Sequence, residues 1–445
     1  MTVPPPGNWR DSGTAGPAAR APGWDPLLMC LAATVLVTTW RVQDLVPILG
    51  TLQFPMLAAA AAYATYFLER DRRRMLSGIK HPVTTLAVVL LILMVASVPG
   101  GVYPGLSFRF IFKDHIKTLG MMLLIAASIR TVTDVERFAW VQVLGAVLYA
   151  LVVLTSVSVG TNGRLGDLWY YDANDLGMLL AATLPLMIYA IRPGVRTLHR
   201  LLGLAGMGVA TLTVVKTGSR GGFLALLGSG AYLLFGFQAI PKRVRVLSVA
   251  ALVVLFMAIA NDHYWSMMGT LLHPTQDYNW SGKAEEGRME IWKRGMGYML
   301  GSPFVGVGAN AFPVAEGTLS PYAARQAIGI GFKWSAAHNS FVQIGAELGV
   351  GGLLCFLALL YSAFRALRRV DRLGRRLPGS APPAALAQAL IATLLAYCIG
   401  GFFLSQAYSP LLYAVLGMIV GLVKVARAWA RTATAGPFAT GGRAA

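Results

Sequence analysis

The chain is a succession of long apolar segments separated by short charged ones. Residues 377–423 contain no aspartate, glutamate, lysine or arginine, and this stretch is long enough for two membrane-spanning helices. Hydrophobic amino acids make up 56% of the 445 residues and charged ones only 13%, whereas a soluble domain carries roughly 25% charged residues. So few charges cannot cover a water-facing surface. We therefore expect an all-α polytopic membrane protein and exclude a soluble enzyme.

Apolar segments of sufficient length recur along the whole chain. A helix needs about 20 mainly apolar residues to cross the hydrocarbon core of a bilayer. Twelve segments are candidates, of which the first and the seventh are short. They lie near residues 26–40, 45–68, 82–99, 108–129, 138–160, 173–191, 201–216, 221–240, 244–261, 338–364, 384–404 and 408–426.

The distribution of positive charge predicts the orientation of these spans. The net charge is +19, from 38 lysines and arginines against 19 acidic residues. Basic residues gather in loops that face the cytoplasm, and alternation from a cytoplasmic amino terminus places every strong basic cluster on that side. We interpret the clusters as topology signals and expect both termini in the cytoplasm and no nucleic-acid partner. The clusters lie at residues 70–74, 130–137, 192–200, 242–245, 365–376 and 424–431.

This topology divides the chain into five parts. Residues 1–25, rich in proline, glycine and alanine and lacking a signal-peptide pattern, are expected to form a disordered cytoplasmic leader. Residues 26–261 would hold spans one to nine, and residues 338–428 spans ten to twelve. Between them, residues 262–337 form one large extracytoplasmic loop, and residues 429–445 are a cytoplasmic tail.

The large loop is rich in aromatic side chains, among them Trp265, Trp280, Trp292 and Trp334. Long loops tend to carry function. Tryptophan and tyrosine can stack on sugars, and they can also form the aromatic belt of a membrane protein. Both interpretations remain open for these residues.

Several sequence patterns of other function classes are missing. The chain has no Asp-x-Asp pair, no His-Glu-x-x-His, no Cys-x-x-Cys and no Walker loop, so we expect no metal site, no cofactor and no ATP-driven transport. No ionisable residue is expected near the middle of a predicted span, which disfavours an ion-coupled transporter.

Candidate site residues stand at the extracytoplasmic ends of the spans. The turn between spans seven and eight reads Lys216-Thr-Gly-Ser219-Arg220-Gly-Gly222. A guanidinium in a glycine-rich turn can bind a phosphate bidentately. An interfacial arginine that meets lipid headgroups is an equally good interpretation.

A short amphipathic helix is predicted inside the loop, where Gly287 and Arg288 precede Trp292. Its spacing places Met289, Trp292, Met296 and Met299 on an apolar side. Arg288 could face an anionic ligand, or it could form an ion pair with Glu285 or Glu286.

The loop re-enters the membrane at His338-Asn339, and a spacing of four places Asn339, Gln343 and Glu347 along one stripe of a helix. Histidine suits proton transfer near neutral pH. A lone histidine is more often a structural hydrogen-bonding group, but His338 heads a polar stripe and shares its face with two arginines.

The order of these motifs resembles the O-antigen ligase and polymerase superfamily. The motifs are Ser219-Arg220-Gly221, a long outward loop with Arg288 and Trp292, then Gly-x-Gly-x-Asn310 and His338-Asn339-Ser-Phe. The likeness covers roughly residues 165–425, and the shared order and sidedness of short motifs carry its specificity.

The resemblance implies a GT-C-like, metal-independent, inverting glycosyltransferase of bacterial lipopolysaccharide biosynthesis. It would act at the periplasmic face of the inner membrane and transfer a glycan from undecaprenyl diphosphate to a lipid or protein hydroxyl, among membrane lipids. Arg220, Arg288 and His338 occupy the positions implied to be catalytic. Residues expected at the substrate are Lys216, Ser219, Asn339, Trp292, Asn310, Asp172 and Asn174, although helix capping is the plainer role for Asp172 and Asn174.

Three other functions remain possible at this point. A polymerase that joins repeat units on undecaprenyl diphosphate needs the same arginines, and so does a protein O-glycosylation ligase. A lipid-linked glycan flippase would form no bond; it predicts a charge-lined central cavity and an internal inverted repeat, and neither is visible in the sequence.

Overall fold

The computed structural model describes residues 23–158, 160, 164–165, 171–192, 194–238, 240–260, 262–273, 277, 279–280, 285–327, 334–376 and 381–434. The predicted leader (residues 1–25) lies almost wholly outside this part of the chain. So does most of the predicted tail, of which only residues 429–434 are described.

The described residues form helices and no β-strand, as the composition predicts. The amino-terminal helices are α1 (Pro26–Thr39), α2 (Val42–Leu45), α3 (Pro47–Thr51), α4 (Phe54–Phe67), η1 (Arg72–Arg74), η2 (Leu76–Ile79), α5 (Pro82–Ser97), α6 (Pro104–Phe110), the π-helical turn η3 (Ile111–His115), α7 (Ile116–Ser128), α8 (Val132–Ser156) and α9 (Ala173–Ala190). The remaining helices are α10 (Thr197–Thr217), α11 (Arg220–Phe235), α12 (Lys242–Ile259), α13 (Asp262–Gly269), α14 (Arg288–Gly301), α15 (Phe312–Leu319), α16 (Ala324–Ala327), α17 (Ser340–Arg376), α18 (Ala381–Gly401) and α19 (Pro410–Thr434).

Ten of the twelve predicted spans coincide with a single helix. Residues 45–68 are divided between α3 and α4, and residues 108–129 form the continuous run α6–η3–α7. Six helices (α8, α9, α10, α17, α18 and α19) are long and apolar enough to cross a membrane, and four shorter ones (α1, α4, α5 and α11) are apolar. The chain therefore has the helices of a polytopic membrane protein, and the count of twelve spans stays a prediction.

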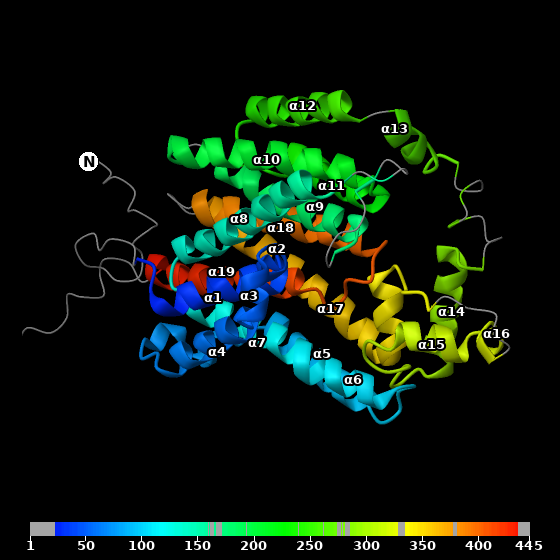
Figure 1. The fold of residues 1–445 in the computed structure, drawn as a ribbon. Coiled ribbons are helices and arrows are strands. Elements are labelled where there is room, and N and C mark those ends of the chain that lie inside the picture. The colour runs from blue at the N-terminus through cyan, green and yellow to red at the C-terminus, as the bar shows by residue number, and fades with distance from the viewer. Residues whose placement is uncertain are drawn as a thin grey trace, which may run out of the picture.

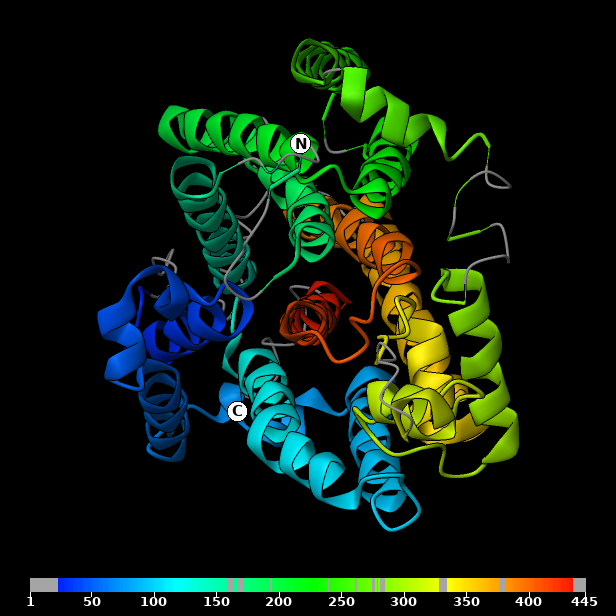
Figure 2. The same ribbon diagram turned by 45° about the vertical axis from the view of Figure 1, so that its right-hand side comes forward.

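The charge-free stretch at residues 377–423 lies in the interior of this bundle. Figure 2 shows α19 near the middle, ringed by the other helices. The described side chains of α18 and of the first half of α19 are almost all buried, including Tyr397, Tyr413 and Leu416. Helix α18 and the first half of α19 lack charge because protein surrounds them, and an ionised side chain would have to be buried there without water.

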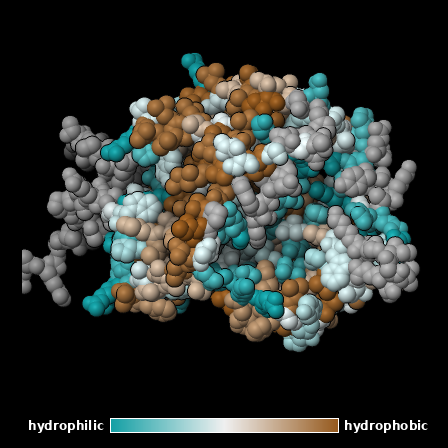
Figure 3. Space-filling model, in the orientation of Figure 1, coloured by the Kyte–Doolittle hydropathy of each residue, from teal (hydrophilic) through white to brown (hydrophobic). Residues whose placement is uncertain are grey.

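Other helices present apolar side chains to the outside. Leu201 and Leu202 of α10 and Leu247 and Val254 of α12 are each more than half exposed. Figure 3 shows hydrophobic surface over much of the middle of one face. An exposed apolar surface of this extent is expected for helices in contact with lipid.

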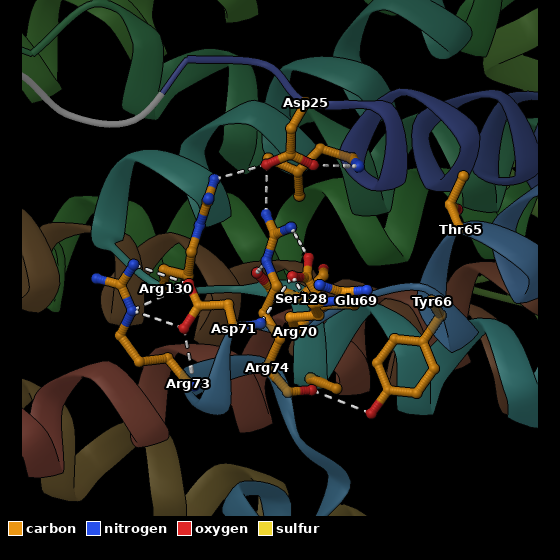
Figure 4. A network of polar contacts seen from close by, with 12 residues as sticks. Asp25, Thr65, Tyr66, Glu69, Arg70, Asp71, Arg73, Arg74, Ser128 and Arg130 are labelled. Carbon is orange, nitrogen blue, oxygen red and sulfur yellow. Dashed lines mark hydrogen bonds and ion pairs between the residues drawn. The ribbon is translucent and has the colours of Figure 1, made fainter.

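Basic segments meet acidic partners at the end of the bundle opposite α14–α16 (Figures 1 and 4). Arg74 is buried, pairs with Asp25 and Glu69, and donates from Nε to the carbonyl of Ser128 at 3.2 Å. Arg130 contacts the same Asp25 at 2.9 Å. The network fastens the residue that caps α1 to two loops. The orientation of the clusters toward the cytoplasm stays a prediction.

Helix α17 is interrupted close to its start. Gly349 has φ +70°, a conformation open to glycine, and the loop before α15 docks on this break. Val307 and Gly308 donate backbone hydrogen bonds to the carbonyls of Ala346 and Glu347 at 2.8 and 3.0 Å. The glycine-rich sequence at residues 306–310 thus supplies turns, as predicted, and holds the loop against the broken helix.

Candidate active site

The three predicted catalytic residues all stand where a helix begins on the loop side of the bundle. Arg220 is the first residue of α11, Arg288 is the first of α14, and His338 lies two residues before α17. The amino end of a helix carries a partial positive charge, which favours bound anions. Arg220 and Arg288 each stand at an end of this kind.

Ser219 caps α11 and places Arg220. The buried Ser219 hydroxyl accepts a hydrogen bond from the backbone N–H of Gly222 at 3.0 Å, a cap that stabilises a helix by about 1 kcal/mol. Lys216 lies in the last turn of α10, and its carbonyl accepts from the N–H of Leu165 at 3.1 Å. The structure thus gives Ser219 a capping role, and substrate contact by Ser219 or Lys216 stays a prediction.

Arg220 is joined to the large loop by an ion pair that the sequence did not reveal. Its Nη1 donates to the Thr270 hydroxyl at 2.7 Å and forms an ion pair with Asp277. The Asp277 side chain is only 4% exposed, while that of Arg220 is 26% exposed. A buried carboxylate therefore orients a guanidinium that still reaches solvent.

A short series of hydrogen bonds connects Asp277 with the backbone next to Arg288. Asp277 Oδ1 accepts from the backbone and side-chain nitrogens of Asn279 at 2.8 and 2.9 Å. The carbonyl of Asn279 accepts from the N–H of Met289, the residue after Arg288, at 3.1 Å. The start of α14 is thereby tied to the ion pair of Arg220, and the two arginines belong to one local structure.

Trp292, one turn after Arg288, links α14 to the segment of His338. Its indole Nε1 donates to the carbonyl of Ala337 at 3.0 Å. Its ring packs edge-on against Trp280 and Phe402, with centroid distances of 5.3 and 5.2 Å. These contacts bring the loop, α14 and the α18–α19 turn together beside His338.

The predicted helix at Arg288 is confirmed, and contact of its predicted apolar side with the membrane stays a prediction. Met296 is 48% exposed, whereas Ile291 and Gly295 are buried. The helix packs against α17 and Phe312 through the small Gly295, so its buried face is rotated toward that contact. The acid Glu285 pairs with Arg325.

His338 is held in an uncommon backbone conformation. Its φ is +46°, and its N–H donates to the Ser405 hydroxyl at 2.8 Å. Asn339, beside it, is buried and caps α17: its Oδ1 accepts from the N–H groups of Phe341 and Val342 at 2.9 and 3.1 Å. Non-glycine residues at positive φ need support from their surroundings and cluster at functional sites.

The turn between α18 and α19 lies where the sequence predicts one, but its contacts with the candidate site were not predicted. Gln406 donates from Nε2 to Asp175 Oδ1 at 2.7 Å, and its backbone N–H donates to the Ser340 hydroxyl at 3.0 Å. Tyr408 donates from its hydroxyl to Glu347 at 2.7 Å. The sequence signal for this element is its polar composition inside the charge-free stretch at residues 377–423.

The predicted polar stripe of α17 faces other protein segments. Gln343 Oε1 accepts from the N–H of Ala407 at 3.4 Å. Glu347 is completely buried and also accepts from the N–H groups of Asn310 and Phe312 at 2.9 and 3.2 Å. Glu347 is thus buried within a predicted span, where the loop backbone and the Tyr408 hydroxyl supply its hydrogen bonds.

Asp172 and Asn174 lie at the start of α9. Asp172 Oδ1 accepts from the N–H groups of Asn174 and Asp175, both at 2.7 Å, so the capping role is confirmed for Asp172. Asn174 Oδ1 accepts from Arg164 Nη2 at 2.9 Å, and Arg164 Nε donates to the carbonyl of Thr217. These contacts connect α9 to the turn that precedes Arg220.

The loop has a charged core of its own beside the candidate site. Arg294 is 10% and Glu316 0% exposed, and they form a two-pronged ion pair with distances of 2.6 to 3.1 Å. The Tyr298 hydroxyl donates to Glu316 at 2.8 Å, and burial raises the pKa of Tyr298. This arrangement fixes α14 against α15 and so fixes the direction in which Arg288 emerges.

Comparison with known proteins finds a family likeness over part of the chain. Residues 205–357 match the family model described as O-Antigen ligase. No curated protein matches the chain. The matched segment runs from α10 into α17 and includes Arg220, Arg288 and His338. The chain therefore has several helices suited to a multi-pass membrane protein, and its residues 205–357 are similar to the O-antigen ligase family, whose members are ligase- and polymerase-like membrane glycosyltransferases.

Proposed function

We propose that the protein is an O-antigen ligase-type glycosyltransferase that moves a glycan from undecaprenyl diphosphate to a hydroxyl of a lipid acceptor related to lipid A-core. The reaction would take place at the periplasmic face of the inner membrane, without a metal ion and with inversion at the anomeric carbon. The observation that carries the proposal is the linked placement of Arg220 and Arg288 through Asp277 and Asn279, with His338 beside Trp292.

The chemistry needs few groups because a glycosyl diphosphate is already activated. The acceptor oxygen forms a bond to the anomeric carbon while the bond from that carbon to the diphosphate oxygen breaks. The two guanidinium groups would stabilise the charge on the departing diphosphate. The acceptor proton would pass to the imidazole of His338, or His338 would orient the hydroxyl.

Two enzymatic alternatives use the same residues. A polymerase would take a second lipid-linked glycan as acceptor, and a protein ligase would take a serine or threonine hydroxyl. The single large loop and the adjacent His338 and Asn339 favour the ligase type. A flippase would move the donor without forming a bond.

The product of the reaction separates these possibilities. Purified protein is incubated with an undecaprenyl-diphosphate glycan and with lipid, peptide or lipid-linked glycan acceptors, and products are identified by mass. The proposal predicts the mass of the lipid acceptor plus the glycan. Elongated undecaprenyl-diphosphate glycan would instead indicate the polymerase, and intact donor with every acceptor would contradict an enzymatic function.

A further inference from the structure

A cavity of about 860 Å³ is lined by Tyr408 and Pro410 at the α18–α19 turn, and Arg220, Arg288 and His338 are not among its lining residues. The end of α1, the α2–α4 segment, the run α6–η3–α7, Asn310 and Tyr408 all contribute to its wall. Asn310, which was predicted to bind substrate with the two arginines, therefore lines this cavity. The volume falls in the range of small-molecule sites, roughly 300–1,000 Å³.

The wall contains a buried histidine that the proposed mechanism does not use. His115 lies in the π-helical turn η3 and is 1% exposed. Its ring packs edge-on against Tyr408 and Tyr413, with centroids 5.6 and 5.1 Å away. Neither ring nitrogen has a hydrogen-bond partner among the described residues. Buried polar groups are normally paired, and single π-turns are frequent at functional sites.

Charged side chains line the cavity: Arg41, Lys113 and Lys117 are cationic, and Asp44 and Asp114 are acidic. Lys113 and Lys117 are exposed, line the cavity and lie four residues apart, on one side of the helix. Lys117 is 3.9 Å from Asp114, a long contact. Arg41 is engaged by two hydrogen bonds with Asp44. The two lysines therefore supply positive charge suited to a phosphate or carboxylate.

An apolar surface adjoins the same cavity. Met56 lines the cavity and is 60% exposed, and Ile48 and Leu52 of the preceding segment are exposed to a similar degree. A ligand that fits both features is an amphiphile, with an apolar tail along α3 and α4 and an anionic head at the lysines.

The α18–α19 turn contributes residues both to the cavity and to the candidate active site. Tyr408 lines the cavity and bonds Glu347, while Ser405, three residues earlier, accepts from the N–H of His338. A head group in the cavity is thus separated from His338 by one short turn.

We propose that this cavity binds the acceptor, an anionic glycolipid, with Lys113 and Lys117 at its phosphate or carboxylate and His115 at a polar group deeper in the cavity. The inference rests on the proposed glycosyl transfer and adds to it a second entrance, distinct from the face of Arg220 and Arg288.

Binding of the acceptor without donor tests this directly. Full-length protein in nanodiscs of zwitterionic lipid is titrated with a phosphate-bearing lipid A-core glycolipid. Replacing both lysines, Lys113→Gln with Lys117→Gln, is expected to raise the Kd at least about tenfold. His115→Phe, which keeps an aromatic ring, is expected to weaken binding severalfold. Arg109→Gln, an exposed cation one turn away and outside the cavity, should leave the Kd unchanged.

The donor provides the internal control. Binding of an undecaprenyl-diphosphate glycan should be the same in the double lysine variant and in the unchanged protein. An unchanged glycolipid Kd in that variant overturns the inference. Displacement of the glycolipid by phosphatidylglycerol or by inorganic phosphate in modest excess also overturns it, since the cavity would then recognise any such anion. Failure of the proposed function would look different: the glycolipid would bind, and no product would form.

Discussion

Arg220 and Asp277 form an ion pair between the first residue of α11 and the large loop, and the carboxylate is the more deeply buried partner. The pair gives one guanidinium a fixed direction, and hydrogen bonds continue from Asp277 through Asn279 to the start of α14. A loop that is distant in sequence is thereby fastened to the residue proposed to bind diphosphate.

Replacing Asp277 tests whether the ion pair orients the Arg220 guanidinium for binding of the donor. Asp277→Asn removes the charge and keeps a similar shape, so the guanidinium loses its fixed direction. A hydrogen bond to a charged group contributes about 1.5–3 kcal/mol, and we expect transfer to fall roughly tenfold or more, measured as kcat/KM for the donor. Asp262→Asn, an exposed acid of the same loop, is the matched control. A lower KM for the donor in Asp277→Asn would show instead that Asp277 competes with the diphosphate.

Ser405 is expected to position His338 without touching substrate. Ser405→Ala removes the acceptor for the His338 N–H while φ at His338 remains unfavourable. We predict a lower kcat with little change in the KM for the donor, and restoration by Ser405→Thr. Ser409→Ala, in the same turn but with a hydroxyl that has no hydrogen-bond partner among the described residues, should have little effect. Equal losses in the two alanine variants would indicate a general disturbance of the turn.

The buried pair of Arg294 and Glu316 should dominate the stability of the loop. Glu316→Gln leaves the Arg294 charge buried without its counter-ion, which costs about 3–5 kcal/mol. We expect a clear fall in the thermal unfolding midpoint in detergent. The exposed pair of Arg325 and Glu285 offers the comparison, and Arg325→Gln should change the midpoint little. A larger effect of Arg325→Gln would contradict this assignment.

The folded protein is expected to lose stability in mild acid because of His81. It caps α5 by accepting from the N–H of Val83 at its Nδ1, and burial, followed by the charges of Arg427 and Arg369, lowers its pKa to about 4. The unfolded chain takes up a proton near pH 6.5, so stability is complete above that pH and declines as the pH falls toward 4. His81→Asn can still cap the helix. Its unfolding midpoint should depend less on pH between 7 and 5 than that of the unchanged protein; an identical dependence would exclude His81 as the cause.

Local signals allowed much of the fold to be predicted. Apolar length placed a helix at each candidate span, the capping role of Asp172 followed from its position before α9, and the glycines at residues 306–310 indicated turns. These features depend on neighbours in the sequence. The motif order also indicated the family that the match at residues 205–357 supports.

Features that depend on distant partners could not be predicted. The pairing of Arg220 with Asp277 depends on how the loop folds, and so does the burial of Glu347 under Asn310 and Phe312. The close approach of α14 to α17 at Gly295 likewise depends on a distant partner, Val342. Catalytic roles for Arg220, Arg288 and His338 stay predictions.

Metal-free transfer that depends on Arg220, Arg288 and His338 is tested by the initial rate of glycan transfer by site variants in the presence of a metal chelator. Arg220→Ala, Arg288→Ala and His338→Ala are compared with Lys293→Ala, an exposed cation on the same helix as Arg288 that pairs with Glu290. We predict that the unchanged protein and Lys293→Ala transfer the glycan with chelator present. The other three variants should lose transfer and remain folded in the membrane. Full activity in all three, or strict dependence on a divalent metal, would contradict this prediction.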